Sequence, residues 1–299
     1  MGVSSGDFIF AGLERLPEPG KEMVCKDFII KPGGAVNTPA ALSRLGAGVA
    51  FVTALGTDYA GGIVYDFLKD NGFNMNPVIF RDDLRTSVSA VLSTPEDRAF
   101  ATYFARSDIG SLESKIVEFA GKSRYIHSFM IDCLELPVIS VAESNNLPFS
   151  VDTHWHEYIR LRDIKEMLCK CDVFFTNEIE ACTLTGKSGY EAAADELAKH
   201  ARLVVVKLGA KGCMVIRGGS ALTMPAFDVG EIKDKTGCGD LFVAGFLYGY
   251  AVCGWQPEKS AALGLTTGAL AATFYGGVDD TFTREHVFEL FKTFYPAYV

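Results

Sequence analysis

The chain contains the stretch Asp234-Lys235-Thr236-Gly237-Cys238-Gly239-Asp240, and an apolar helical pattern follows it at residues 241–247. Two glycines around one small residue allow a tight turn that bares backbone N–H groups. At a helix start, these groups and the helix dipole favour an anion such as a phosphate. Asp240 would lie beside that anion, where a carboxylate can accept the proton of an attacking hydroxyl. Capping of the helix by Thr236 or Asp240 explains the same residues equally well.

A second glycine turn lies near the start of the chain, in Pro32-Gly33-Gly34-Ala35-Val36-Asn37. Gly33 and Gly34 let a ligand approach the backbone closely. Asn37 is placed to start a helix, and its amide can bond sugar hydroxyls. A plain strand-to-helix turn is the alternative interpretation.

Two further segments follow apolar strands in the middle of the chain. Asn177 and Glu180 come after the strand at 173–176 and could hold a hydrated magnesium ion beyond its carboxyl end. Solvated carboxylates at a helix start are the alternative there. Lys207, Gly209 and Gly212 close the strand at 203–208, as a ligand loop or as a glycine-rich hairpin.

Short apolar segments alternate with longer helical patterns over most of the chain, which predicts a mostly parallel sheet covered on both faces by helices. The expected strands are residues 49–55, 125–129, 148–152, 173–176, 203–208 and 213–217. The expected helices are residues 38–45, 61–71, 113–120, 191–200, 239–252, 259–274 and 284–294.

Two segments depart from this alternation, residues 22–30 and 86–104, which are rich in β-branched and aromatic residues. The second alternates in polarity on both sides of an expected hairpin turn at 93–98. We expect a small antiparallel sheet that serves as a lid over a site or as a subunit interface.

Chain length, composition and net charge limit the class of protein. The chain has 299 residues, of which 48% are hydrophobic, and this predicts one large domain over residues 1–299. A net charge of -9 argues against a nucleic-acid partner. No apolar run approaches the roughly 20 residues of a membrane span, so no membrane role is expected. Eight scattered cysteines and no signal-peptide pattern at the start favour a cytoplasmic protein with reduced thiols.

In this order, the four motifs resemble those of the ribokinase-like (PfkB-type) carbohydrate kinase family, and the Asp234–Asp240 motif is highly specific. The resemblance covers nearly the whole chain, including Leu45-Gly46-Ala47 and Leu55-Gly56-Thr57-Asp58. It implies a three-layer α/β core with a mostly parallel central sheet. It also implies a β lid formed from about residues 12–32 and 86–106, a homodimer through that lid, and the use of ATP and Mg²⁺.

The resemblance also implies a role for individual residues. The catalytic set would be Asp240 as base with the backbone of Gly237, Cys238 and Gly239 as anion hole. The nucleotide-binding set would be Lys207, Gly209, Gly212, Thr236, Thr266, Gly268 and Ala269. The set that binds the sugar-like acceptor would be Asp7, Gly33, Gly34, Asn37 and Arg106. Asn177 and Glu180 would organise Mg²⁺ through water, and Asp234 a monovalent cation.

Some positions depart from the family pattern. Lys235 stands where many members carry Thr, which leaves a K⁺ ion open. Ala35 stands where members that use ribose or phosphosugars often carry Lys, which favours a neutral acceptor. Few residues precede Asp7, where the family has a full first strand. His154 and His156 are expected to pack or lie on the surface rather than to bind substrate or metal.

The expected activity is therefore transfer of the γ-phosphoryl group of MgATP to a hydroxyl of a sugar or sugar-like molecule. A nucleoside kinase of the same family is one alternative, with Phe8, Phe10, Tyr103 or Phe104 stacking on the base. A non-catalytic sugar- or nucleotide-binding relative is another. A dinucleotide-dependent oxidoreductase is disfavoured, since no Gly-x-Gly-x-x-Gly follows an early strand.

Overall fold

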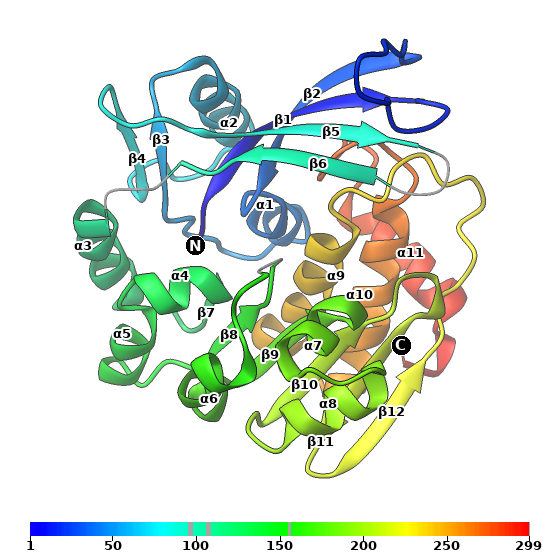
Figure 1. Ribbon diagram of the computed structural model, residues 1–299. Coiled ribbons are helices and arrows are strands. Elements are labelled where there is room, and N and C mark those ends of the chain that lie inside the picture. The colour runs from blue at the N-terminus through cyan, green and yellow to red at the C-terminus, as the bar shows by residue number, and fades with distance from the viewer. Residues whose placement is uncertain (95–97, 106–108, 155–156, 299) are drawn as a thin grey trace.

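The centre of the protein is a six-stranded sheet between two layers of helices, seen in a computed structural model (Figure 1) that describes residues 1–94, 98–105, 109–154 and 157–298. The strand order is β12-β11-β10-β9-β8-β7. Strands β7 to β10 run parallel, and β11 and β12 add an antiparallel edge. The strands are β7 (Ile126–Phe129), β8 (Phe149–Asp152), β9 (Val173–Asn177), β10 (Leu203–Lys207), β11 (Cys213–Arg217) and β12 (Ser220–Met224).

Alternating side chains of this sheet pack into two separate apolar clusters, one on each face. On β9, Val173 and Phe175 join one apolar cluster, whereas Phe174 joins the other. Successive side chains of a strand point to opposite faces, so a strand buried on both faces has a continuously apolar sequence. The mostly parallel sheet with helices on both faces, predicted from such strands, is confirmed.

The helices divide between these two faces. The first cluster holds side chains of α1 (Asn37–Arg44), α9 (Cys238–Leu247), α10 (Pro257–Ala271) and α11 (Arg284–Phe294). The second holds those of α3 (Ile109–Ala120), α4 (Met130–Glu135), α5 (Val138–Ser144), α6 (Leu161–Lys170), α7 (Glu178–Thr185) and α8 (Tyr190–Ala198). A π-helical turn, Tyr248–Val252, continues α9, and short 3-10 turns occur at Gly209–Lys211 and Pro296–Tyr298.

A small four-stranded sheet lies apart from the central sheet, at the top of Figure 1. Its strands, in spatial order, are β2 (Asp27–Gly34), β1 (Ser4–Ala11), β5 (Ser87–Ser93) and β6 (Arg98–Tyr103). The separate sheet was predicted, but its purely antiparallel pairing was wrong, because β1 inserts between the two predicted segments and runs parallel to β5. The expected turn at 93–98 falls largely on residues 95–97, outside the described residues.

The region around residues 49–81 also differs from expectation. The predicted strand at 49–55 is β3 (Thr53–Gly56), which pairs with the unforeseen β4 (Val78–Arg81) in a two-stranded parallel sheet, with α2 (Tyr59–Asp70) between them in sequence. Within the described residues, no helix is both long enough and apolar enough to cross a membrane.

Candidate active site

Helix α9 begins at a glycine turn that remains partly exposed while the rest of the helix lies in the core. Gly237 adopts a left-handed conformation with φ of 79°, which favours glycine. A Cβ at Gly237 would also lie 2.9 Å from the backbone of Gly277, so two chain segments meet closely there. The predicted turn at a helix start is therefore present.

The backbone amides of this turn refine the predicted anion site. The N–H of Cys238 donates to the carbonyl of Lys235 at 3.3 Å, so this amide is engaged. The N–H of Gly239 and that of Asp240 precede the first helical bond, which runs from Leu241 to Gly237. Within the described residues they have no acceptor. We infer that these two amides, rather than that of Cys238, face an incoming anion.

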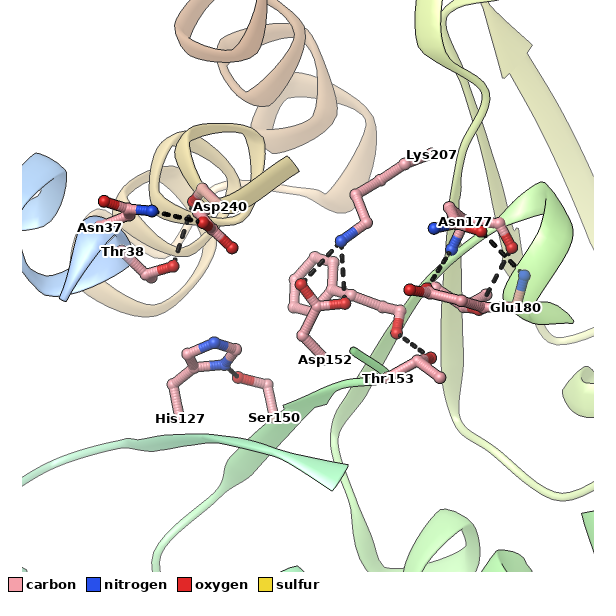
Figure 2. Close-up of polar contacts among 12 residues, drawn as sticks. Asn37, Thr38, His127, Ser150, Asp152, Thr153, Asn177, Glu180, Lys207 and Asp240 are labelled. Carbon is pink, nitrogen blue, oxygen red and sulfur yellow. Dashed lines mark hydrogen bonds and ion pairs between the residues drawn. The ribbon is translucent and has the colours of Figure 1, made fainter. Parts of the chain in front are cut away.

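Asp240 is held by the early glycine motif, 203 positions away in the sequence (Figure 2). The side-chain amide of Asn37 donates to Oδ2 of Asp240 at 2.8 Å, and the hydroxyl of Thr38 donates to the Asp240 carbonyl at 3.2 Å. Burial raises the pKa of Asp240 to about 6, against the hydrogen bond from Asn37, which lowers it. The carboxylate is therefore mostly ionised at neutral pH and ready to accept a proton.

Asp7 lies on β1, on the face of the small sheet that meets the second glycine motif. A Cβ at Gly33 would fall 1.9 Å from a carboxylate oxygen of Asp7, so only glycine fits beside it. The hydroxyl of Ser5 donates to Asp7 at 2.7 Å, and burial raises the pKa of Asp7 to about 6. Gly34 turns with φ of 64° next to the carbonyl of Val3.

A row of hydroxyls beside Asp7 was not predicted. In the register of the sheet, Asp7 is opposite Ser89, whose hydroxyl lies 3.0 Å from that of Thr102. The period-two alternation of β5 and β6 is a signal that could have placed Ser89 and Thr102 on one face. The sequence did not show that β1 lies beside them.

Asn177 and Glu180 form a reciprocal capping box at the start of α7. The N–H of Glu180 donates to Oδ1 of Asn177 at 2.8 Å, and the N–H of Asn177 donates to Oε2 of Glu180 at 3.0 Å. Glu180 is buried, and this burial raises its pKa above the ordinary value, while the ammonium of Lys207 opposes the rise. Glu180 still has its Oε1 for a further partner, so capping and ligand binding are compatible.

Lys207 ends β10 and makes the central ion pair of the site with Asp152, a residue to which the sequence assigned no role. Its Nζ lies 2.8 and 2.7 Å from the two oxygens of Asp152 (Figure 2). Burial disfavours the charged ammonium, but Asp152 and Glu180 outweigh this and raise the pKa of Lys207. A charged residue ending an otherwise apolar strand was the available signal for Asp152.

The remaining predicted nucleotide residues lie on two elements. Gly209 and Gly212, with φ of 58° and 103°, make the tight connection between β10 and β11, a glycine-rich hairpin as the alternative interpretation had it. On α10, Thr266 is fully buried and its hydroxyl donates to the carbonyl of Ala262 within the helix. Gly268 and Ala269 are partly exposed beside it. The nucleotide contacts of this set remain predictions.

Gly268 also has a packing role. A Cβ at this position would lie 3.0 Å from the carbonyl of Cys238, so glycine lets α10 approach the start of α9. The partly exposed surface around the phosphate turn therefore includes this point of α10.

Asp234 is buried and ties the phosphate turn to the loop after α10. Its Oδ1 accepts the N–H of Thr236 at 3.1 Å and the hydroxyl of Thr236 at 2.9 Å. Its Oδ2 accepts the N–H of Gly276 at 3.1 Å. Three donors thus converge on the carboxylate predicted to bind a monovalent cation.

His154 follows β8 with a left-handed φ of 49° and packs between aromatic rings. Its ring centroid lies 4.9 Å from that of Phe129 and 6.1 Å from that of Phe104, which follows β6 of the small sheet. Arg106 and His156 lie outside the described residues.

Together the site offers a half-buried carboxylate, free amides at a helix start, an ion-paired ammonium and hydroxyl-binding groups on a second sheet. The structure brings together residues 37, 152, 177, 180, 207 and 240 from six elements, at the carboxyl ends of three parallel strands and at three helix starts (Figure 2). This is the edge at which open α/β sheets bind ligands. Proton abstraction from a hydroxyl next to a bound phosphate is the chemistry that it supports.

Comparison with known proteins agrees with this geometry. The profile of the pfkB family of carbohydrate kinases matches residues 6–283. Fructokinase-1 of Zea mays is 28% identical over 292 residues, covering 89% of this chain and 90% of its own. A nucleoside kinase of Methanocaldococcus jannaschii is 22% identical over 285 residues, covering 92% and 90%.

The fold has close counterparts among solved structures. That of Arabidopsis thaliana ribokinase complexed with ribose and ATP superimposes with a TM-score of 0.79 at 22% identity, covering 97% of each chain. The ribokinase-like fold predicted from the motif order is thereby confirmed. The chain belongs to the pfkB family of carbohydrate kinases, which are phosphotransferases with a hydroxyl group as acceptor.

Proposed function

We propose that the chain transfers the γ-phosphoryl group of ATP to a hydroxyl of a neutral sugar or sugar-like acceptor, with Asp240 as general base. The observation that carries this proposal is the hydrogen bond from Asn37 to Asp240. It joins the acceptor-side motif and the phosphate-side motif on one carboxylate. The partial exposure of Asp240, next to fully buried helix neighbours, supports its access to a substrate.

In the proposed mechanism, Asn37 occupies Oδ2 of Asp240, and Oδ1 accepts the proton of the acceptor hydroxyl. The amides of Gly239 and Asp240 stabilise negative charge on the transferring phosphoryl group. Asp7 and the hydroxyls beside it bind other hydroxyls of the acceptor. Closure of the small sheet over the site would exclude water and limit ATP hydrolysis.

The chemistry of the site fits a magnesium ion next to Glu180. Its Oε1 is available to a metal-bound water, and carboxylate oxygens are the ligands that Mg²⁺ prefers. Asn177 uses its oxygen in the capping box and retains its NH₂ group, which suits a phosphate oxygen or a water rather than the metal. When bound, Mg²⁺ would neutralise charge on the β- and γ-phosphates of ATP.

Asp234 does not fit a monovalent-cation site in the same way. Its carboxylate already accepts three N–H or O–H donors, with one amide N–H on each oxygen. A cation needs oxygen ligands there instead of donors. We infer that Asp234 links two loops through hydrogen bonds and that turnover does not depend on K⁺.

A nucleoside acceptor is the second candidate, and the aromatic group Phe104, His154 and Phe129 favours it. The ring of Phe104 is 59% exposed and faces His154 from the small sheet. Of the other rings considered for base stacking, Phe8 and Phe10 pack against Phe28 on the opposite face of that sheet. Tyr103 lies on that same face in the strand register. Phe104 is therefore the ring among them that is placed to contact a base.

We further propose a homodimer through that opposite face of the small sheet. The strand register places ten side chains on it, none of them charged: Phe8, Phe10, Phe28, Ile30, Val88, Ala90, Leu92, Ala99, Ala101 and Tyr103. Phe28 and Tyr103 are 49% and 54% exposed. An uncharged apolar face of this kind marks an interface, and a second copy of the same face is complementary to it.

A panel assay tests the activity. Release of ADP from MgATP is measured with D-fructose, D-ribose, sugar acids, polyols, cytidine and inosine as acceptors. Asp240→Asn should bind ATP normally but lose transfer by about 10³-fold or more, because the base is removed while the fold is kept. Asp195→Asn, the same change at an exposed carboxylate on α8, is the matched control.

Near-normal turnover of Asp240→Asn would contradict the assignment of the base. Phosphorylation of nucleosides but not of sugars would favour the second candidate. Binding of ATP without a phosphorylated product from any acceptor would support a non-catalytic relative.

A further inference from the structure

Asp152 and Lys207 form an ion pair whose purpose the proposed mechanism leaves unexplained. Asp152 ends β8 and Lys207 ends β10, and β9 lies between these strands. The pair therefore bridges the carboxyl ends of three parallel strands. The Lys207 side chain is 15% exposed and that of Asp152 5% exposed, so solvent screens their interaction weakly.

The side chain of Lys207 also lies beside the phosphate turn. A Cβ added to Gly239 would lie 3.5 Å from Nζ of Lys207, with the Cε and Cδ atoms of the lysine at 3.9 and 3.8 Å. Gly239 is one of the two residues whose amides face the proposed phosphoryl site. The absence of a side chain at this position leaves the lysine beside these amides.

The hydrogen-bond geometry leaves Lys207 one donor. An ammonium carries three N–H groups, and the two bonds to Asp152 account for two of them. Both oxygens of Asp152 are used on the same nitrogen, which restricts rotation of the ammonium. Figure 2 shows Lys207 directed at Asp152 between Asp240 on one side and Glu180 on the other.

A purely structural ion pair is the competing explanation. Buried pairs are often no more stabilising than neutral residues of the same size. In that case the pair should be replaceable by neutral side chains without loss of ligand affinity. The position of Lys207 beside Gly239 and the remaining donor argue for a role at the phosphate site instead.

We propose that Asp152 is a positioning residue, which holds the ammonium of Lys207 against Gly239 so that its third N–H faces the γ-phosphoryl group of ATP. A fixed positive charge at that point needs no reorganisation when charge develops on the phosphate oxygens. Asp152 itself touches neither substrate. This inference rests on the proposed function, because it presumes that ATP occupies the site.

Nucleotide binding tests the proposal without knowledge of the acceptor. Calorimetry in excess Mg²⁺ gives the affinities for ADP and for the non-hydrolysable analogue AMP-PNP, and their ratio isolates the γ-phosphate. Lys207→Met should reduce the relative affinity for AMP-PNP about tenfold, since a charge-assisted bond to the γ-phosphate is lost, while ADP binding changes about twofold or less. Asp152→Asn should act in the same direction, and Lys207→Arg should retain part of the preference.

The double variant Asp152→Asn/Lys207→Met separates the two explanations. It removes both charges, so thermal stability should recover relative to either single variant. The proposal expects its AMP-PNP preference to stay as low as that of Lys207→Met. Recovery of both stability and AMP-PNP preference would show that the pair is structural and would overturn the proposal.

Two further outcomes are distinct. Normal ADP binding with the same AMP-PNP preference in all variants would overturn the positioning role alone. Failure of the unaltered protein to bind either nucleotide would overturn the proposed function, and this inference with it.

Discussion

Replacement of Asn37 by alanine should move the acid limb of the pH–rate profile. The Asn37 amide donates to the ionised form of Asp240 at 2.8 Å and so lowers the pKa of this carboxyl group, which stands at about 6. A hydrogen bond to a charged group contributes about 1.5–3 kcal/mol, and about 1.4 kcal/mol corresponds to one pKa unit. We therefore expect the pKa of Asp240 to rise by about one to two units, to about 7–8.

The sign follows from the form that is active. The base works only when ionised, so activity is lost as the pH falls through its pKa. At pH 7 the ionised fraction should drop from about 90% to about 10–50%, which lowers kcat/KM about two- to tenfold. This part of the loss should disappear above about pH 9, whereas any lost contact of Asn37 with the acceptor persists at every pH.

The assay is kcat/KM from pH 5 to pH 10, with the best acceptor of the panel. Thr38→Val is the matched control, because the Thr38 hydroxyl bonds the backbone carbonyl of Asp240 and not its carboxylate. Its acid limb should coincide with that of the unaltered enzyme. Coincidence of the Asn37→Ala limb with these two would refute the reasoning.

Three further predictions follow from close contacts and surfaces. Gly277→Ala places a Cβ 1.7 Å from Oδ1 of Asn37, so it should displace the amide and shift the acid limb of the pH–rate profile to higher pH, as Asn37→Ala does. It should also lower the free energy of unfolding by about 1–3 kcal/mol. Gly62→Ala, with open space around it, should have neither effect. Exchange of K⁺ for tetramethylammonium should change kcat less than about twofold, because Asp234 already accepts three donors, and strict K⁺ dependence would contradict that role. Light scattering should show a dimer that Phe28→Glu converts to a monomer, since the charge would be buried unpaired, and a monomeric unaltered protein would refute the interface.

Local patterns predicted much of the fold because they report directly on local structure. The strand Cys213–Arg217 and the helix Arg284–Phe294 have the bounds that their patterns predicted. Both have a single strong periodicity within one continuous segment. The glycine motifs likewise mark turns whose backbone requirements are local, as the left-handed Gly237 shows.

The features that the sequence did not predict are contacts between strands that are distant in the chain. Strand β1 was missed because Ser4–Ala11 pairs with segments about 25 and 80 positions further on. No pattern within residues 4–11 indicates which segments those are. Asp152 received no role because its partner, Lys207, lies 55 positions away across an intervening strand. The family resemblance supplied residue roles but not these two contacts.

The bond between Asn37 and Asp240 also sets when the enzyme can first work during its synthesis. The two residues are separated by 203 positions, and ribosomes add about 5–20 residues per second, so about 10–40 s pass between their appearance. Until α9 emerges, the chain lacks both Asp240, the proposed base, and the glycine turn at which α9 begins. Under the proposed mechanism, a chain that ends before α9 therefore cannot bind the phosphoryl group and abstract a proton at this site.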